Sequence, residues 1–233
     1  MKADKDFKKL EKEIGCTFKN KDLLKQAMVH RSYLNEHRNF HLGSNERLEF
    51  LGDAVLELVV TQHLYLNYEN PEGDLTNWRA SLVNSVMLAK IAKHFTLEPL
   101  LYLSHGESKE KEGKARNQIM ANTIESLIGA IYLEHDYDEA KKFIDKFILI
   151  ELKNILENEL FLDPKSKFQE TAQDKIGITP SYRVLSESGP DHARHFIVGV
   201  YLNNDKIAEG EGTSKHEAQL VAAAAALKVK NWE

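Results

Sequence analysis

Apolar residues recur at three- and four-residue spacing along most of the first 160 residues of the chain. A helix advances about 100° per residue, so this spacing gathers the apolar side chains on one side of a helix. We find no long alternating run there, so the pattern predicts that this part is all-helical. The predicted helices cover 7–15, 20–30, 45–68, 73–95, 116–136 and about 138–157, and the breaks lie at Gly15, 35–44, 70–73 and the charged segment 104–116, predicted to be a mobile surface loop.

The pattern changes after residue 160. A short helix, a meander of three antiparallel strands and a strong final helix are predicted, with both helices on one face of the sheet. Ser214 and Glu217 have the spacing of a capping box, which predicts where the final helix begins. The predicted fold is thus an all-α domain, 1–158, followed by an α+β (α-β-β-β-α) domain, 164–233, with a hinge at Asp163-Pro164. The predicted elements of the second domain are a helix at 166–175, strands at 181–189, 195–203 and 205–212, and a helix at 213–230.

Composition and charge narrow the class of protein. The chain has 233 residues, 42% of them hydrophobic, and a single cysteine, Cys16, which excludes an intramolecular disulfide and fits a reducing compartment. The first twenty residues are charged, and no apolar run approaches the length that spans a bilayer. We therefore expect a soluble cytoplasmic protein with no membrane partner. The net charge is −5, and residues 164–233 hold nine Lys/Arg and nine Asp/Glu, so any binding to nucleic acid must rest on a local basic patch.

An acidic stripe runs along the apolar segment 45–58. Glu46, Glu49, Asp53 and Glu57 fall within a narrow sector of one helix face, although each like-charged pair costs a few tenths of a kcal/mol. Such stripes are commonly solvated surface. Gly52 argues for another role here, because a glycine inside a helix costs up to about 1 kcal/mol and suggests that another element approaches closely.

A second acid lies in a strongly apolar segment. Glu125 follows Asn122 by three residues within 119–132, so the two share one helix face. Two buried helices that each offer oxygen ligands are how an all-helical protein would build a site for a hard cation such as Mg²⁺. A cation would also offset the repulsion within the acidic stripe.

These residues carry a family resemblance. The segment NERLEFLGDAVL, 45–56, resembles the signature of the ribonuclease III family of double-stranded-RNA endonucleases. HRSY at 30–33, GDLTNWRASLVN at 73–84 and IMANTIESLIGAIYLE at 119–134 are similar to further motifs of that family. KFQETAQ, GPDHARHF and GTSKHEAQLVAAAAAL in the C-terminal part resemble a double-stranded-RNA-binding domain. The resemblance covers nearly the whole chain.

The resemblance implies roles for particular acids. The principal metal-binding and catalytic acids fall on Glu49, Asp53 and Glu125, with Glu46 as a further catalytic acid and Glu72 as a substrate-side acid. Glu57 has no counterpart and is expected on a solvated face. Phe50 matches an aromatic that docks into a partner subunit, so a homodimer is expected, and His30 is expected to form structural hydrogen bonds.

Asn122 departs from the family pattern, which usually has a fourth carboxylate at this position. Its amide oxygen could still coordinate Mg²⁺, or it could orient a bound water, but it brings no negative charge. The leading interpretation is an Mg²⁺-dependent endonuclease, with Mn²⁺ able to substitute. The resemblance implies 5′-phosphate and 3′-hydroxyl ends with two-nucleotide 3′ overhangs, in rRNA and mRNA processing. The alternative is a duplex-RNA-binding protein that Asn122 has disabled for cleavage. A third reading, a helical protein–protein adaptor, is disfavoured by the second domain.

Duplex-RNA binding is assigned to the second domain. A-form duplexes are read by shape, through 2′-hydroxyls and phosphates. The residues that the resemblance places on this surface are Gln169, Glu170 and Gln173 of the first helix, His192 of the first strand connection, and Ser214, Lys215 and His216 at the start of the last helix. The family commonly has two lysines at 215–216, and a histidine carries less positive charge than a lysine at pH 7.

Overall fold

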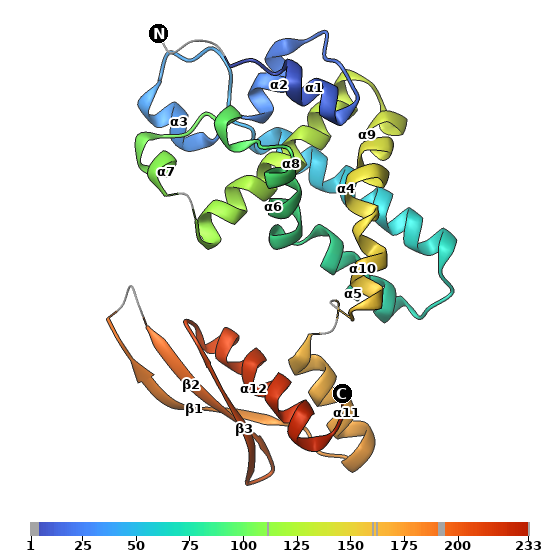
Figure 1. The fold of residues 1–233 in the computed structure, drawn as a ribbon, viewed down its shortest axis with the longest axis vertical. Helices are drawn as coiled ribbons and strands as arrows, with labels where there is room; N and C mark the ends of the chain where they lie inside the picture. Colours follow the sequence, from blue (N-terminus) through green and yellow to red (C-terminus); the bar gives the residue numbers. More distant parts are fainter. Residues whose placement is uncertain (1–4, 111, 160, 162, 191–193, 233) are drawn as a thin grey trace. The chain divides into compact units, whose positions relative to one another are not determined.

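The structure is a computed structural model that describes residues 5–110, 112–159, 161, 163–190 and 194–232. The chain divides into two compact units, Met1–Phe161 and Leu162–Glu233. The first is helical and the second combines helices with a sheet (Figure 1). Among the described residues, no helix is both long and apolar enough to cross a membrane.

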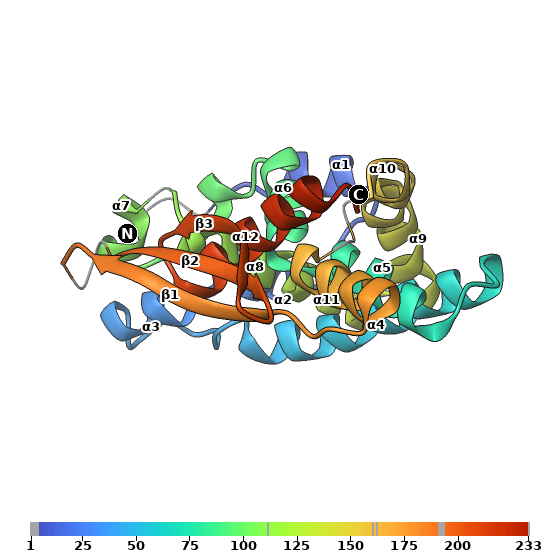
Figure 2. The same cartoon turned by 90° about the horizontal axis from the view of Figure 1, so that it is seen from below.

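Two long helices, α4 and α8, form the centre of the first unit and cross each other (Figure 1). Figure 2 shows α4 as one continuous helix. Leu56 of α4 and Ile124 and Ile128 of α8 are fully buried and belong to one hydrophobic core. The elements are α1 (Lys8–Ile14), α2 (Lys21–Ala27), α3 (Arg31–Glu36), α4 (Glu46–Asn67), α5 (Glu72–Val83), α6 (Ser85–His94), η1 (Glu98–Leu100), α7 (His105–Lys109), α8 (Lys114–Glu134), α9 (Tyr137–Ile144), the π-helical η2 (Asp145–Leu149) and α10 (Glu151–Glu157).

The crossing of α4 and α8 is a backbone-to-backbone contact. A Cβ atom built on Gly52 would lie 1.7 Å from the carbonyl oxygen of Glu125, and one built on Gly129 would lie 2.3 Å from the carbonyl oxygen of Leu48. No side chain fits at either position. Gly52 therefore has the role that the sequence predicts, since it lets another helix approach at this point.

Four details of the first unit differ from the predicted pattern. The segment 73–95 is two helices, because Asn84 is extended and its side-chain oxygen accepts hydrogen bonds from the N–H groups of Val86 (3.1 Å) and Met87 (2.9 Å), which caps α6. The predicted loop 104–116 contains α7 and the first residues of α8, and α3 continues from the HRSY motif into the predicted break 35–44. A π-helical turn interrupts the predicted helix 138–157.

The second unit has the predicted α-β-β-β-α order. It consists of α11 (Pro164–Ile176), β1 (Ser181–Ser188), β2 (His195–Leu202), β3 (Asp205–Gly212) and α12 (Lys215–Lys230), with the strands antiparallel in the order β1-β2-β3. α12 packs on β2 and β3, and α11 packs against α12, so both helices cover the same face of the sheet (Figure 1). The predicted fold class is confirmed for both parts of the chain.

Small residues make the contact between α12 and the sheet. Ala222, Ala223 and Ala226 are fully buried in one cluster with Phe168 of α11. A Cβ atom on Gly210 of β3 would lie 2.2 Å from the backbone nitrogen of Ala222. The predicted start of the last helix is confirmed, since Ser214 is the N-cap residue of α12 and its hydroxyl accepts from the N–H of Glu217 at 3.2 Å, while the Glu217 carboxylate accepts from the N–H of Thr213 at 2.9 Å.

Candidate active site and RNA-binding surface

The first turns of α4 carry three of the predicted acids. Glu46 and Asp53 are exposed, whereas Glu49 is half-buried. Glu46 accepts a hydrogen bond from the hydroxyl of Ser44 at 2.8 Å and lies 3.6 Å from the guanidinium of Arg31. The helix thus presents its carboxylates at the end nearest α3.

The helix crossing brings Glu125 of α8 beside these acids. Its backbone carbonyl lies against Gly52, which is flanked on α4 by Glu49 and Asp53. Burial, and then the negative charges of Asp53 and Glu49, raise the pKa of Glu125 to about 7. Burial also raises the pKa of Glu49. A side-chain hydrogen bond with Asn122 lowers this pKa, whereas the negative charges of Glu46 and Asp53 raise it further. These shifts show that acids from two helices share one electrostatic environment.

A cleft of about 590 Å³ opens beside this cluster. Glu46 and Glu49 of α4 line it, and Gln118 and Asn122 of α8 form the facing wall. The Gln118 side chain donates a hydrogen bond of 2.6 Å to the Asn122 side-chain oxygen. Asp53 and Glu125 are not among the residues that line the cleft, so Glu49 is the predicted ligand common to the cleft and to the acidic cluster.

The donor set suits a divalent cation, because carboxylate oxygens are the ligands that hard cations prefer and a cation would relieve the repulsion that raises the pKa of Glu125. As the side chains stand, however, no group of three or more His, Cys, Asp or Glu side chains in the described part of the chain is arranged to hold a metal ion. Glu49, Asp53 and Glu125 were predicted to converge on one cation. In the structure they lie near enough for their charges to interact, but they are not arranged as a complete set of ligands.

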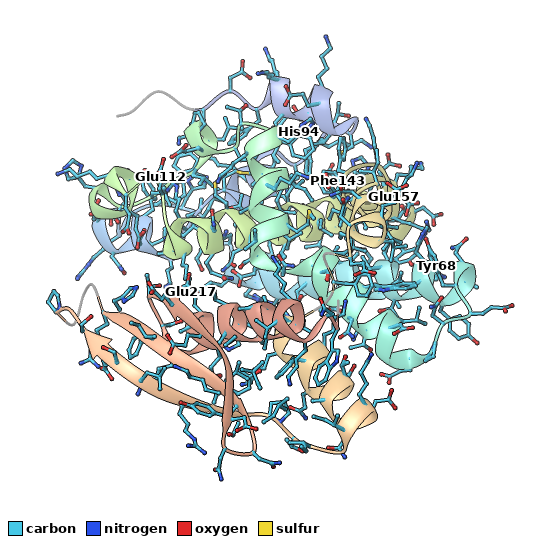
Figure 3. The ribbon with its side chains drawn as sticks, turned by 60° about the horizontal axis from the view of Figure 1, so that its bottom comes forward. Tyr68, His94, Glu112, Phe143, Glu157 and Glu217 are labelled. Carbon is cyan, nitrogen blue, oxygen red and sulfur yellow. The ribbon has the colours of Figure 1, made fainter. Side chains whose placement is uncertain are left out.

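Two further acids lie away from this cluster. α4 has 22 residues and spans about 33 Å; Glu46 begins it, whereas Glu72 lies beside its other end, in a second cleft with Thr61 and Tyr68. Figure 3 labels Tyr68 where α4 ends. Within one chain, Glu72 is therefore not brought to the other acids. Glu57 was expected on a solvated face; its side chain is 37% exposed and also forms an ion pair of 2.9 Å with Arg79.

His30 and Phe50 have contrasting environments. His30 caps α3, since its Nδ1 atom accepts from the N–H of Ser32 at 3.3 Å, and burial lowers its pKa. This agrees with the expected structural role. Phe50 is 80% exposed, which excludes an ordinary core position. It lines a cleft of about 650 Å³ together with Leu23, Leu51 and Leu133.

The second unit presents its predicted RNA-binding residues on exposed positions. Gln169, Glu170 and Gln173 are exposed on α11, and Gln173 accepts a hydrogen bond of 3.3 Å from the hydroxyl of Thr179. Lys215 and His216 are exposed in the first turn of α12, after the capping residue Ser214 (Figure 3 labels Glu217 in the same turn). His192 lies outside the described residues.

The ammonium group of Lys215 has two neighbours in the fold. It lies 3.9 Å from a carboxylate oxygen of Glu187 and 5.6 Å from the ring centre of Phe196. Glu187 also pairs with Arg194 at 2.7 Å. The positive charges of Lys215 and Arg194 are thus partly neutralised within the unit itself, which agrees with its balanced overall charge.

One residue of the candidate site was missed by the sequence reasoning. Gln118 precedes Asn122 by four residues and therefore lies on the same face of α8, one turn away. That spacing was visible in the sequence. Nothing in it, however, distinguished Gln118 from an ordinary exposed polar residue at the start of a helix.

An all-helical unit with acids at a helix crossing, followed by an α-β-β-β-α unit, is the arrangement that the resemblance to a nuclease joined to a duplex-RNA-binding domain implies. Comparison with known proteins agrees: residues 20–152 match the family model described as Ribonuclease-III-like, and residues 164–230 match the double-stranded RNA binding motif. The chain belongs to the ribonuclease III family of endoribonucleases, whose members generally depend on divalent metal ions.

Similar proteins cover almost the whole chain. Proteins named Ribonuclease 3 from Natranaerobius thermophilus and Enterococcus faecalis are each 42% identical to it, over 95% and 94% of this chain and 95% of each relative. A crystal structure of the nuclease domain of ribonuclease III from Campylobacter jejuni matches with a TM-score of 0.56 and 38% identity, covering 63% of this chain and 96% of that one. A second structure of that domain is described as showing structural flexibility in a region involved in dimer formation.

Proposed function

We propose that this chain is a dimeric, Mg²⁺-dependent endonuclease that cuts double-stranded RNA and leaves 5′-phosphate and 3′-hydroxyl ends with two-nucleotide 3′ overhangs. Its proposed cellular role is rRNA and mRNA processing in the cytoplasm. Residues 1–158 would cut and self-associate, and residues 164–233 would bind the duplex. The observation that carries the proposal is the placement of Glu125 beside Glu49 and Asp53 across the glycine contact of α4 and α8.

The side chains that would hold the cation are Glu49, Asp53 and Glu125, with Glu46 at the edge of the cleft. A bound Mg²⁺, or Mn²⁺ in its place, would lower the pKa of a water molecule and stabilise the departing 3′-oxygen. The chain's own contribution is to keep three carboxylates adjacent in a half-buried setting. With its pKa near 7, Glu125 can accept or release a proton at neutral pH when no cation is present. Glu72 remains a proposed substrate-side acid.

Self-association is supported by Phe50. A phenylalanine that is 80% exposed costs solvation free energy in a monomer, and the apolar cleft at its base could receive the same residue of a second copy. Two copies would carry two acidic clusters, one for each strand of the duplex. Phe50→Ala should therefore shift the full-length protein toward monomer in sedimentation velocity, and an unchanged dimer would contradict this assignment.

Duplex binding is assigned to the exposed residues of α11 and to the start of α12. Gln169, Glu170 and Gln173 would meet minor-groove hydroxyls, and Lys215 and His216 would meet phosphates at the N-terminus of α12. His192 is proposed to contact a second minor groove.

The competing function is a duplex-RNA-binding protein that does not cleave. It is favoured by one observation, the amide of Asn122 in place of a family carboxylate. The test is incubation of the full-length protein with a perfect RNA duplex and Mg²⁺. Cleavage that is lost in Glu125→Gln, with duplex affinity kept within a few fold, supports the nuclease. Cleavage that is absent in the wild type and gained by Asn122→Asp supports the competitor.

Glu57→Gln is the matched control. Glu57 belongs to the same acidic stripe of α4, but it pairs with Arg79 and has no counterpart in the family motif. The same chemical change there should leave cleavage within about twofold. A loss comparable to that of Glu125→Gln would mean that the whole stripe acts as one electrostatic unit, and would refute the assignment of particular acids.

A further inference from the structure

Asn122 occupies a defined position between two other side chains. It lies on α8 one turn before Glu125 and one turn after Gln118, and it is half-buried. Glu49, Gln118 and Asn122 all line the same cleft. The sequence left two roles open for this residue, as a ligand through its amide oxygen or as a group that orients a bound water.

The hydrogen bonds of the Asn122 amide discriminate between these roles. Its oxygen accepts from the side-chain nitrogen of Gln118 at 2.6 Å, a short bond for a neutral pair. An amide has one acceptor oxygen and one donor NH₂ group on opposite arms. With the oxygen directed to Gln118, the donor arm is the one available to the carboxylate of Glu49, which lines the same cleft and whose pKa the Asn122 side chain lowers.

A carboxylate at position 122, as the family usually has, would present oxygen to the acidic cluster and add repulsion. The asparagine presents N–H to it and adds none. Turning the Asn122 amide over, so that its oxygen faced a cation beside Glu49, would withdraw the donor arm from Glu49 and would require Gln118 to turn its amide as well, since otherwise two NH₂ groups would face each other. The orientations of the two amides on α8 are therefore coupled, and in the structure the Asn122 oxygen is directed to Gln118.

Resting on the proposed function above, we propose that Asn122 is a hydrogen-bond donor that orients the carboxylate of Glu49, and that Gln118 is the positioning residue that holds Asn122 in this role. On this view Asn122 is not a ligand of the divalent cation. Removing a residue that orients a metal ligand without touching the metal commonly changes metal affinity or activity by about 10- to 100-fold. The effect of this relay, from Gln118 through Asn122 to Glu49, should therefore be measurable.

The first experiment tests the relay without metal or RNA. In the full-length protein with chelator, the side-chain amide signals of Asn122 are followed by ¹H–¹⁵N NMR in Gln118→Ala and in Glu49→Gln. Both variants should shift these signals. Gln62→Ala is the control and should not shift them. Gln62 is an exposed glutamine on α4, and its side chain accepts a hydrogen bond from Tyr137 at 2.8 Å. The proposal would be overturned if the Asn122 signals did not shift in Gln118→Ala or in Glu49→Gln.

The second experiment separates positioning from ligation. Mn²⁺ binding is measured from the electron paramagnetic resonance signal of free Mn²⁺ for Gln118→Ala, Asn122→Ala and the double variant. Each single variant should weaken binding about tenfold, and the double variant no further than Asn122→Ala, because both act through one relay. A large loss in Asn122→Ala alone, with Gln118→Ala unchanged, would make Asn122 a ligand and overturn the proposal.

Cleavage kinetics complete the test. Gln118→Ala should lower kcat about tenfold while KM for the duplex stays within twofold, because Gln118 is assigned to no RNA contact. A change in KM alone would indicate an RNA contact and would contradict the positioning role. A wild type that neither binds Mn²⁺ nor cuts RNA would refute the proposed function, whereas the NMR experiment would still decide the relay.

Discussion

In both units of the protein, glycine residues allow a helix to contact another element at the backbone, but the residues that surround the two contacts differ. In the first unit, Gly52 and Gly129 let α4 and α8 touch at their backbones. In the second, Gly210 lets β3 touch α12 at Ala222. The first contact lies directly between acids of the two helices, whereas the second lies among buried alanines, Ala218 and Ala222.

The difference follows from what each unit has to do. Hydrolysis needs several oxygen atoms from different elements at one point, so the fold must press like charges together, and the raised pKa of Glu125 reflects this. Recognition of a duplex needs groups spread over a long surface. A close contact in the second unit therefore stabilises the scaffold and has no direct effect on the electrostatics of the binding residues.

Gly52→Ala should have the largest effect. The added Cβ would lie 1.7 Å from a backbone oxygen, and neither helix can yield without separating from the other. We expect cleavage to fall below detection and the first unit to lose at least about 3 kcal/mol of unfolding free energy, at the upper end for an overpacked core. Calorimetry and a cleavage assay measure this.

Gly73→Ala is the control for that variant. Gly73 lies in the first turn of α5, and among the described residues no atom comes within 4 Å of a Cβ built there. Alanine is the better helix former, so the unfolding free energy should stay equal or rise by up to about 1 kcal/mol. Equal behaviour of the two variants would show that the close contact does not set the geometry of the site.

Gly210→Ala should break the second contact while leaving the first intact. Its Cβ would lie 2.2 Å from the nitrogen of Ala222 and 2.5 Å from the carbonyl oxygen of Ala218. We expect duplex affinity to fall by about 100-fold as β3 and α12 separate, with an overpacking cost of about 1–3 kcal/mol confined to the second unit. Filter binding and calorimetry on the full-length protein report the two effects. A shift in the melting of the first unit would contradict the separation.

The pH dependence of stability should have opposite signs at two carboxylates of the first unit. Folding raises the pKa of Glu125 from 4.5 to about 7, so between these values the folded chain keeps a proton that the unfolded chain has released. The unfolding free energy should therefore fall as the pH rises through this window, by about 2 kcal/mol after allowance for partial exposure. Urea titrations of metal-free protein measure it, and Glu125→Gln should remove the slope.

Glu11 provides the comparison. Burial raises the pKa of this carboxyl group, but bonds from Lys21 (2.6 Å) and from the N–H of Phe18 (2.7 Å) outweigh burial, so the net shift is downward. Its contribution is present above the unfolded pKa and is lost as the pH falls through the folded one. Glu11→Gln should cost about 1.5 kcal/mol at pH 7, and little at low pH. An equal cost of Glu11→Gln at pH 7 and at low pH would contradict the conclusion that the Glu11 carboxyl group is ionised in the folded protein at pH 7.

Lys215→Ala should have the smallest effect. A single phosphate contact contributes about 1 kcal/mol, and its loss should lower the salt dependence of duplex binding by about one unit of slope without affecting kcat. Lys206→Ala is the control, because this lysine is also exposed on the second unit and also forms an ion pair, with Glu209, but it lies in β3 and is assigned to no RNA contact. Equal losses in both variants would indicate a general charge effect.

The elements of this protein could largely be predicted from the sequence. Periodic apolar spacing identified the helical part, alternation and turn residues identified the three strands, and Ser214 with Glu217 identified the start of α12. The errors came from side chains that act locally. Asn84 ends one helix and begins another through its own hydrogen bonds, which the apolar period of 73–95 does not register.

Within the candidate site, the sequence by itself determined which residue types lie on which helix face, because spacing alone sets that. It also marked Gly52 as a point of close approach. Only the tertiary structure decided which faces meet. The position of Glu72 at the far end of α4 from Glu46 and the ion pair between Glu57 and Arg79 both depend on contacts between residues far apart in the chain. Such contacts follow from how whole helices pack, and no local pattern encodes them.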